Sequence, residues 1–160
     1  MIREMLGIAE GILQDLHDDH NEVATLMERI SDSESGAERT ALFQEMSTKL
    51  LAHAQAEQEI LYSRLETSSD EETRRFALEG TSEHGLIEQQ VKKISGMGAP
   101  MSDGWAAELK VLEDLIEHHV DEEEGAGFGC AREEFETEEL EAMAEEFQRR
   151  KEGLMLSARD

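Results

Sequence analysis

Apolar residues recur every three or four positions through most of this chain, which is the pattern of amphipathic α-helices. The first run places Ile12, Leu16, Val23 and Met27 along one stripe. Polar segments rich in Ser, Asp and Gly, together with the single proline Pro100, interrupt the pattern. The runs predict four long helices and a short fifth helix, over about residues 2–32, 36–65, 70–95, 102–125 and 137–155.

The polar segments also carry signals for helix starts. Ser35 with Glu38, and Ser69 with Glu72, have the form of capping boxes, in which the N-cap side chain binds the backbone N–H three residues later. Thr137 is the N-cap that we expect for the last helix. Three glycines are expected to loosen the end of the fourth helix, because glycine is a poor helix former. They are Gly125, Gly127 and Gly129.

Short connections between long helices favour antiparallel neighbours. The sequence therefore predicts an all-α fold, namely an up-down-up-down four-helix bundle with a short extra C-terminal helix. The chain has 160 residues, the length of one domain, and we expect residues 1–160 to form a single helical-bundle domain. Aromatic residues make up only 4% of the chain, which suits a helical protein better than a β-sandwich or barrel.

Four of the six histidines lie on the apolar stripes, one on each predicted long helix. They are His20, His53, His84 and His119. Each lies between 15 and 20 residues from the neighbouring turns, which are near residues 35, 68 and 99. At about 1.5 Å per residue, these spacings put all four histidines in one layer of the bundle, within roughly two turns of each other. Independent core histidines would have no reason to share a layer.

Two of these histidines are followed four residues later by a glutamate, in the pairs His53/Glu57 and His119/Glu123. This spacing puts both members of a pair on one helix face, where they can hold a metal ion together. Buried carboxylates without partners would cost several kcal/mol, which favours a metal site over a metal-free core. Imidazole and carboxylate donors without thiolate suit iron, manganese or zinc. Six such ligands predict a dinuclear non-haem iron centre with open positions for water, dioxygen or peroxide.

Other histidines and acids leave alternatives for the ligand set. His17 lies about 60° to one side of the first stripe and is expected to flank the core. His118 and Glu122 have the same four-residue spacing as His119 and Glu123, and they remain the alternative pair. They point about 140° and about 100° away from the core direction of their helix, which favours the His119 register.

The net charge is −24, from 39 acidic and 15 basic residues. This balance disfavours nucleic acid and anionic lipid as partners, since both require a basic face. No apolar run approaches the roughly 20 residues of a membrane span, and the N-terminal segment lacks the long apolar core of a signal peptide. Cys130 is the single cysteine, which fits a reducing compartment, so we expect a cytoplasmic protein. The sequence leaves the oligomeric state open.

The short sequence segments around these histidines and glutamates resemble those of the hemerythrin-like, or HHE cation-binding, family, and the resemblance covers about residues 8–150. The matching segments are Asp19-His20-Asn21-Glu22-Val23, His53-Ala54-Gln55-Ala56-Glu57, Glu83-His84 and His118-His119-Val120-Asp121-Glu122-Glu123-Glu124. Tyr62 follows His53 by nine residues and Phe128 follows His119 by nine, and this shared offset supports the His119/Glu123 register. Each His-x-x-x-Glu motif alone is weak, but the order of the four segments is specific.

The resemblance implies a bundle that holds two iron ions per chain, with an oxo or hydroxo bridge. It also implies binding of O2, NO, peroxide or azide, or sensing of iron or redox state; the alternative is an enzyme with catalase-like or peroxidase-like activity. Oxygen-carrying members have a His-x-x-x-His pair on the third helix, where this chain has His84-x-x-x-Glu88. Glu88 is either a seventh ligand or a surface residue, and the missing imidazole makes reversible O2 carriage less expected. A ferritin-like oxidase would instead show Glu-x-x-His pairs.

Overall fold

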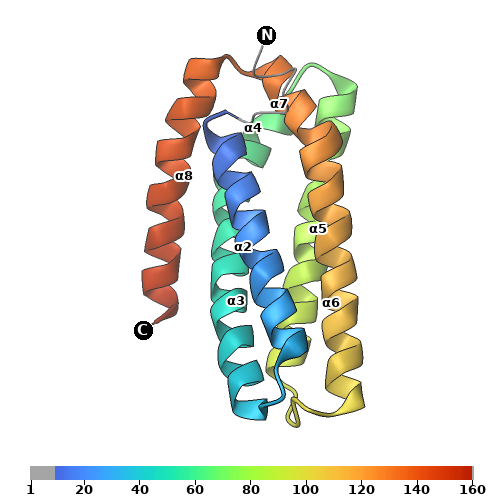
Figure 1. Ribbon diagram of the computed structural model, residues 1–160. Helices are drawn as coiled ribbons and strands as arrows, with labels where there is room; N and C mark the ends of the chain where they lie inside the picture. The colour runs from blue at the N-terminus through green and yellow to red at the C-terminus, as the bar shows by residue number, and fades with distance from the viewer. Residues whose placement is uncertain (1–9, 160) are drawn as a thin grey trace.

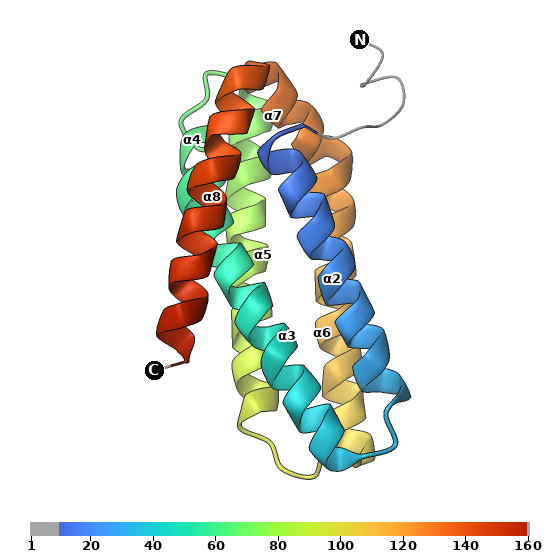
Figure 2. The same ribbon diagram turned by 60° about the vertical axis from the view of Figure 1, so that its left-hand side comes forward.

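The computed structural model describes residues 10–159, which form helices and connecting turns with no strand in that range. Four long helices lie side by side (Figures 1 and 2). They are α2 (Ile12–Asp32), α3 (Gly36–Glu57), α5 (Glu71–Ser95) and α6 (Asp103–Glu122). A further helix, α8 (Thr137–Ala158), lies along α2 and α3 outside these four. Among the described residues, no helix is long and apolar enough to cross a membrane.

Two of the long helices continue through a π-helical turn. α3 passes through η1 (Gln58–Tyr62) into α4 (Ser63–Leu65), so residues 36–65 are helical as expected. In the same way α6 passes through η2 (Glu123–Gly127) into α7 (Phe128–Glu134). The expected helix end near residue 125 is therefore wrong. Gly127 serves close packing instead, because a Cβ there would overlap the ring of Phe76.

The observed N-cap residues of α3 and α5 can be compared with the predicted ones. Ser35 caps α3 and accepts a hydrogen bond from the backbone N–H of Glu38, as expected. α5 is capped by Asp70 rather than by the expected Ser69: the Asp70 carboxylate accepts from the backbone N–H of Thr73 at 2.9 Å. Ser and Asp both suit an N-cap, so adjacent candidates leave the start uncertain by one residue.

The first and last helices also differ from the prediction in the residues at which they start or end. α8 is capped by Glu136 rather than Thr137, and it extends to Ala158, so it is not short. The first helix was expected from residue 2, and residues 2–9 lie outside the described range. Within that range α2 starts only at Ile12, because Gly11 has a φ of 52°, a left-handed conformation that ends a helix. A Cβ at Gly11 would also overlap the backbone of Leu140 in α8.

The buried apolar side chains form two clusters, one toward each end of the four helices. On α2, Leu16 belongs to one cluster and Val23 to the other, and His20 lies between them. On α3, Leu50 and Ala56 flank His53 in the same way. The histidine positions thus occupy a polar layer between two apolar cores, as the heights along the sequence predicted.

Candidate metal centre

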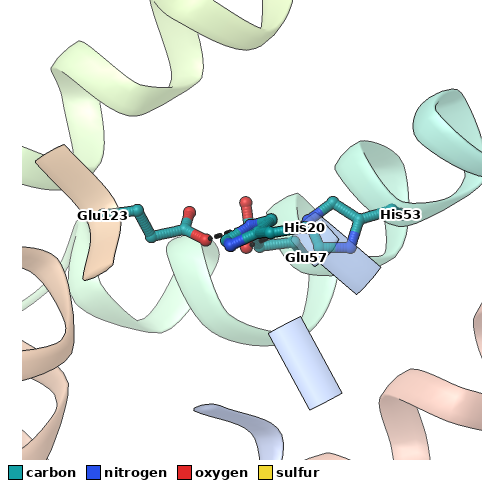
Figure 3. Close-up of side chains that lie close together, drawn as sticks. All are labelled: His20, His53, Glu57 and Glu123. Carbon is teal, nitrogen blue, oxygen red and sulfur yellow. Dashed lines mark ion pairs between the residues drawn. The ribbon is translucent and has the colours of Figure 1, made fainter. Parts of the chain in front are cut away.

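Six side chains meet in the layer between the two cores. They are His20 of α2, His53 and Glu57 of α3, His84 of α5, His119 of α6 and Glu123, the first residue of η2. Glu57 is 0% and Glu123 1% exposed. Figure 3 shows Glu123 approaching from one side and His53 from the other, with His20 and Glu57 between them. The structure therefore brings together all six residues that the sequence pattern selected.

The six residues form two groups that share both carboxylates. Donor atoms of His20, His53, Glu57 and Glu123 lie within 4.8 Å of one another. Donor atoms of Glu57, His84, His119 and Glu123 do the same. Each group combines two imidazoles with the same two glutamates. The arrangement can hold two cations, with each glutamate within reach of both.

Five of the ligand atoms that face the cluster have no hydrogen-bond partner, although they lie close to one another. Nε2 of His20 lies 3.1 Å from Oε1 of Glu123, and Nε2 of His53 lies 3.6 Å from Oε2 of Glu57. None of these buried atoms has a hydrogen-bond partner, and neither has Oε1 of Glu57. Nε2 of His84 and Nε2 of His119 face each other at 3.0 Å. Buried polar atoms are rarely left without partners, so these orphaned donors fit a bound metal well.

Three of the four histidines are held from behind by a carboxylate on a neighbouring helix. In each, Nδ1 contacts the acid and Nε2 faces the cluster, the arrangement that fixes the ring of a metal-binding histidine. The pairs are His20 with Glu124 at 2.8 Å, His53 with Asp19 at 2.8 Å and His119 with Glu83 at 3.0 Å. Nδ1 of His84 is buried without a partner.

Comparison with known proteins identifies the family. Residues 11–131 match the description "Hemerythrin HHE cation binding domain". The chain belongs to this family. It is also 30% identical over 129 residues to a "DNA nickase" of Nostoc sp. (strain PCC 7120 / SAG 25.82 / UTEX 2576). That alignment covers 81% of this chain but 36% of the Nostoc protein, so the chain spans about a third of that relative. No solved structure gives a significant match.

The supporting acids of this hemerythrin-family chain were not predicted from the sequence, although each is next to a residue of the cluster. Asp19 precedes His20 but contacts His53, and Glu83 precedes His84 but contacts His119. Neighbouring residues on a helix point about 100° apart, so an acid beside one histidine faces the next helix. The available signal was the acid directly beside three of these positions: Asp19 beside His20, Glu83 beside His84 and Glu124 beside Glu123.

Tyr62 contacts two residues of the cluster, Glu123 and His84. It is fully buried, donates a hydrogen bond to Oε2 of Glu123, and stacks on the ring of His84 at 5.1 Å between centroids. Nine residues of regular helix would turn Tyr62 about 180° from His53, and the extra residue of η1 reduces this to about 80°. Burial and the nearby carboxylates raise the pKa of Tyr62 well above its ordinary value, so it remains a donor.

The alternative ligands lie outside both groups. The side chain of His118 is 66% exposed, and Glu122 is exposed as well. His17 is partly exposed and contacts Glu124. Glu88 is exposed and pairs with Lys92 at 2.7 Å, which fits the surface interpretation of this residue. Among the residues that the structure describes, the cluster thus contains His119 and Glu123 and no fifth imidazole.

Charges in the cluster depend on each other. Burial by itself lowers the pKa of His20 and His119, but the surrounding carboxylates outweigh it and raise these pKa values to about 10 and about 12. Burial raises the pKa of Glu123, yet both histidines together hold it well below its ordinary value. In the absence of metal, protons on imidazole therefore balance the buried carboxylates. A cation can take over this role.

Proposed function

We propose that this protein is a non-haem di-iron protein, built on an up-down-up-down bundle, that binds O2, NO or peroxide or senses iron or redox state. The ligands of the two irons would be His20, His53, Glu57, His84, His119 and Glu123. The observation that carries the proposal is the pair of His2Glu2 groups sharing Glu57 and Glu123, with orphaned donor atoms inside them. Nitrogen and oxygen donors without thiolate suit iron, and membership of a cation-binding family supports a metal centre.

A small cavity beside the histidines supports the binding of small ligands. Its volume is about 20 Å³, enough for one water-sized molecule. All four histidines line it, and most of the remaining wall is aliphatic, including Leu50, Ile87 and Ile116. Asp19 also lines it, but that carboxylate already accepts from His53 and Lys151. A space of this size favours ligands of a few atoms over larger substrates.

The residues of the chain would control the chemistry around this cavity. Bound iron would supply redox cycling and open coordination positions. His20, His53 and His119 would bind through Nε2, because the acids behind them hold Nδ1. Nε2 of His84 also faces the cluster, 2.9 Å from Oε1 of Glu57. Tyr62 fixes one oxygen of Glu123. The aliphatic wall excludes water and offers a bound ligand no hydrogen-bond donor.

The aliphatic wall also helps to distinguish a reversible O2 carrier from a peroxide-consuming enzyme. A bound O2 would lack a hydrogen-bond donor from the aliphatic wall, and Glu88 stands on the surface where oxygen carriers have a fifth histidine. We therefore expect air to reoxidise the reduced protein without a long-lived O2 adduct. Peroxide turnover of catalase or peroxidase type is the second candidate, because the same two irons and open positions would serve it.

The test is to load the purified protein with iron and measure the metal and its ligands. We expect two irons per chain, new absorption when azide is added to the oxidised protein, and rapid reoxidation by air. Oxygen evolution from peroxide would establish the enzymatic alternative. A stable, reversible O2 adduct would instead make the protein an oxygen carrier. One zinc and no iron, after expression with ample iron, would contradict the proposal.

The name of the Nostoc relative raises the question of DNA cleavage. We propose that this activity does not extend to the present chain, which spans 36% of that protein. The net charge of −24 opposes binding of the phosphate backbone, which requires a basic surface. Nicking of supercoiled plasmid by the iron-loaded protein at moderate salt would overturn this expectation.

A further inference from the structure

α8 reaches the metal cluster through a lysine. Nζ of Lys151 donates to both carboxylate oxygens of Asp19, at 2.8 and 2.9 Å. Oδ2 of Asp19 in turn lies 2.8 Å from Nδ1 of His53. The side chains of Lys151 and Asp19 are only 14% and 13% exposed, so this ion pair is largely shielded from water. Lys151 follows the segment 11–131 that matches the family.

The same helix packs an aromatic side chain on His53. Phe147 is fully buried, and its ring meets the His53 ring edge-on, at 5.7 Å between centroids and 87° between planes. Nζ of Lys151 lies 5.2 Å from the centroid of the Phe147 ring. One turn of α8 therefore contacts His53 directly through Phe147 and indirectly through Asp19. The orientation of this histidine depends on the position of α8.

The lysine distinguishes His53 from the other supported histidines. The acid behind His20 also contacts His17, and the acid behind His119 also contacts His118. Both of those second contacts are imidazoles at the surface. Asp19 instead contacts an ammonium group, which donates to both of its carboxylate oxygens. A fixed cation holds the carboxylate ionised and in one place.

We propose that Lys151 is a positioning residue that couples α8 to the metal centre through Asp19 and His53. Outer-shell partners orient metal-binding histidines and commonly change metal affinity about 10–100-fold when they are lost. Lys151 fixes such a partner, and its charge adds to the field at the centre. This inference rests on the proposed metal centre, and it adds that α8 sets the stability and reduction potential of that centre.

The chain offers a matched control at the next position. Arg150 also extends from α8 to an acid on the α3 side, Glu59, with Nε 2.6 Å from Oε2. This pair is exposed, with 43% and 41% of the two side chains accessible, and Glu59 is not in either donor group. Arg150→Met therefore removes one positive charge and one contact between α8 and its neighbours, without touching the path to His53.

The experiment compares Lys151→Met, Arg150→Met and Lys151→Arg in the iron-loaded full chain. We expect Lys151→Met to release iron to a chelator about tenfold faster, the low end of the range for lost outer-shell partners. The midpoint reduction potential should fall, because loss of a nearby cation favours the ferric state. Arg150→Met should change neither quantity. Lys151→Arg should restore both, since a hollow of about 210 Å³ borders Lys151 and leaves room for the longer side chain.

A second substitution keeps the inference testable if Lys151→Met does not fold. Asp19→Asn retains the shape of the side chain and removes the charge that Lys151 binds, so it should speed iron release to at least the same extent. Equal iron release and equal potentials in Lys151→Met and Arg150→Met would overturn the coupling while leaving the metal centre intact. Failure of the unsubstituted protein to bind iron would instead overturn the proposed function.

Discussion

Glu57 and Glu123 are the residues that make a metal-free interior costly. Both are almost fully buried, and both lie within hydrogen-bonding range of imidazole nitrogens that are not aligned to bond with them. A buried carboxylate costs several kcal/mol unless it is paired. Removing one histidine therefore has two effects: a ligand is lost, and a buried negative charge loses a partner.

The ligand set can be tested by single substitutions. His53→Ala and Glu57→Ala should lose iron and lower Tm together, because metal binding contributes to the folding free energy. His118→Ala is the matched control, since its side chain is 66% exposed and lies outside both groups. Iron content and thermal unfolding measure both effects. If His118→Ala emptied the site and His119→Ala did not, the proposed register on α6 would be wrong by one residue.

A second prediction at this scale concerns pH. The pKa of His20 is raised to about 10 and that of His119 to about 12, from an ordinary 6.5. A raised histidine pKa stabilises the fold fully below about pH 6.5, and the stabilisation is lost as pH rises through the folded-state values. Tm of the metal-free protein should therefore fall between about pH 7 and about pH 10.

Iron-loaded protein provides the comparison for the pH prediction. In that form the proposed ligand imidazoles would already be deprotonated by the metal, so Tm should change less over the same range. Thermal unfolding of chelator-treated and iron-loaded samples at matched pH measures the difference. A metal-free Tm that increases toward pH 10, or parallel curves for both forms, would contradict the assignment of protons to His20 and His119.

At the scale of helices, the sequence predicts the polar layer of histidines. The position of a residue along the bundle axis depends only on the number of residues between it and the nearest turn. His20 and His84 lie where that count places them, between the two apolar cores. The π turns were not predicted, because periodicity assumes 3.6 residues per turn and cannot reveal one inserted residue. Both π turns adjoin a proposed ligand, since η1 follows Glu57 and η2 starts at Glu123. The acids that support the histidines were missed as well, because assigning them requires the rotation of neighbouring helices.

The packing between α5 and η1 gives a prediction for this scale. A Cβ on Gly80 would lie 2.5 Å from Cε2 and 2.9 Å from the hydroxyl oxygen of Tyr62, so Gly80→Ala must displace the ring. Overpacking of this kind costs about 1–3 kcal/mol. The hydrogen bond from Tyr62 to Glu123 should be disturbed too, which should shift the azide absorption of the iron-loaded protein.

Gly85→Ala is the control on the same helix. Nothing lies within 4 Å of a Cβ at Gly85, so alanine there should stabilise α5 by about 0.5–1 kcal/mol. Urea unfolding of the two variants gives the comparison. Equal stability of both, or destabilisation by Gly85→Ala alone, would show that the contact between Gly80 and Tyr62 does not constrain the protein.

At the scale of the whole molecule, the apolar pattern predicted a fifth helix but underestimated its length and role. α8 continues to Ala158, and its residues Met143 and Phe147 are fully buried in the core that lies beside the cluster. Its apolar positions indicated burial, but they could not indicate which helices it covers. Lys151 appeared only as one charge among many, because its partner Asp19 lies 132 residues away.

Charge also acts on the whole molecule. The net charge of −24 on 160 residues should oppose compaction at low ionic strength, since exposed like charges repel over a Debye length of about 10 Å at 0.1 M salt. We expect Tm of the iron-loaded protein to rise by about 2–8 °C between low and moderate salt, equivalent to roughly 1–2 kcal/mol. Thermal unfolding over a salt series measures this. Sodium chloride and potassium chloride should act alike, because screening depends on ionic strength rather than on the cation. A flat response would mean that local pairs such as Arg150 with Glu59 already neutralise the repulsion, and a response to only one salt would indicate specific ion binding.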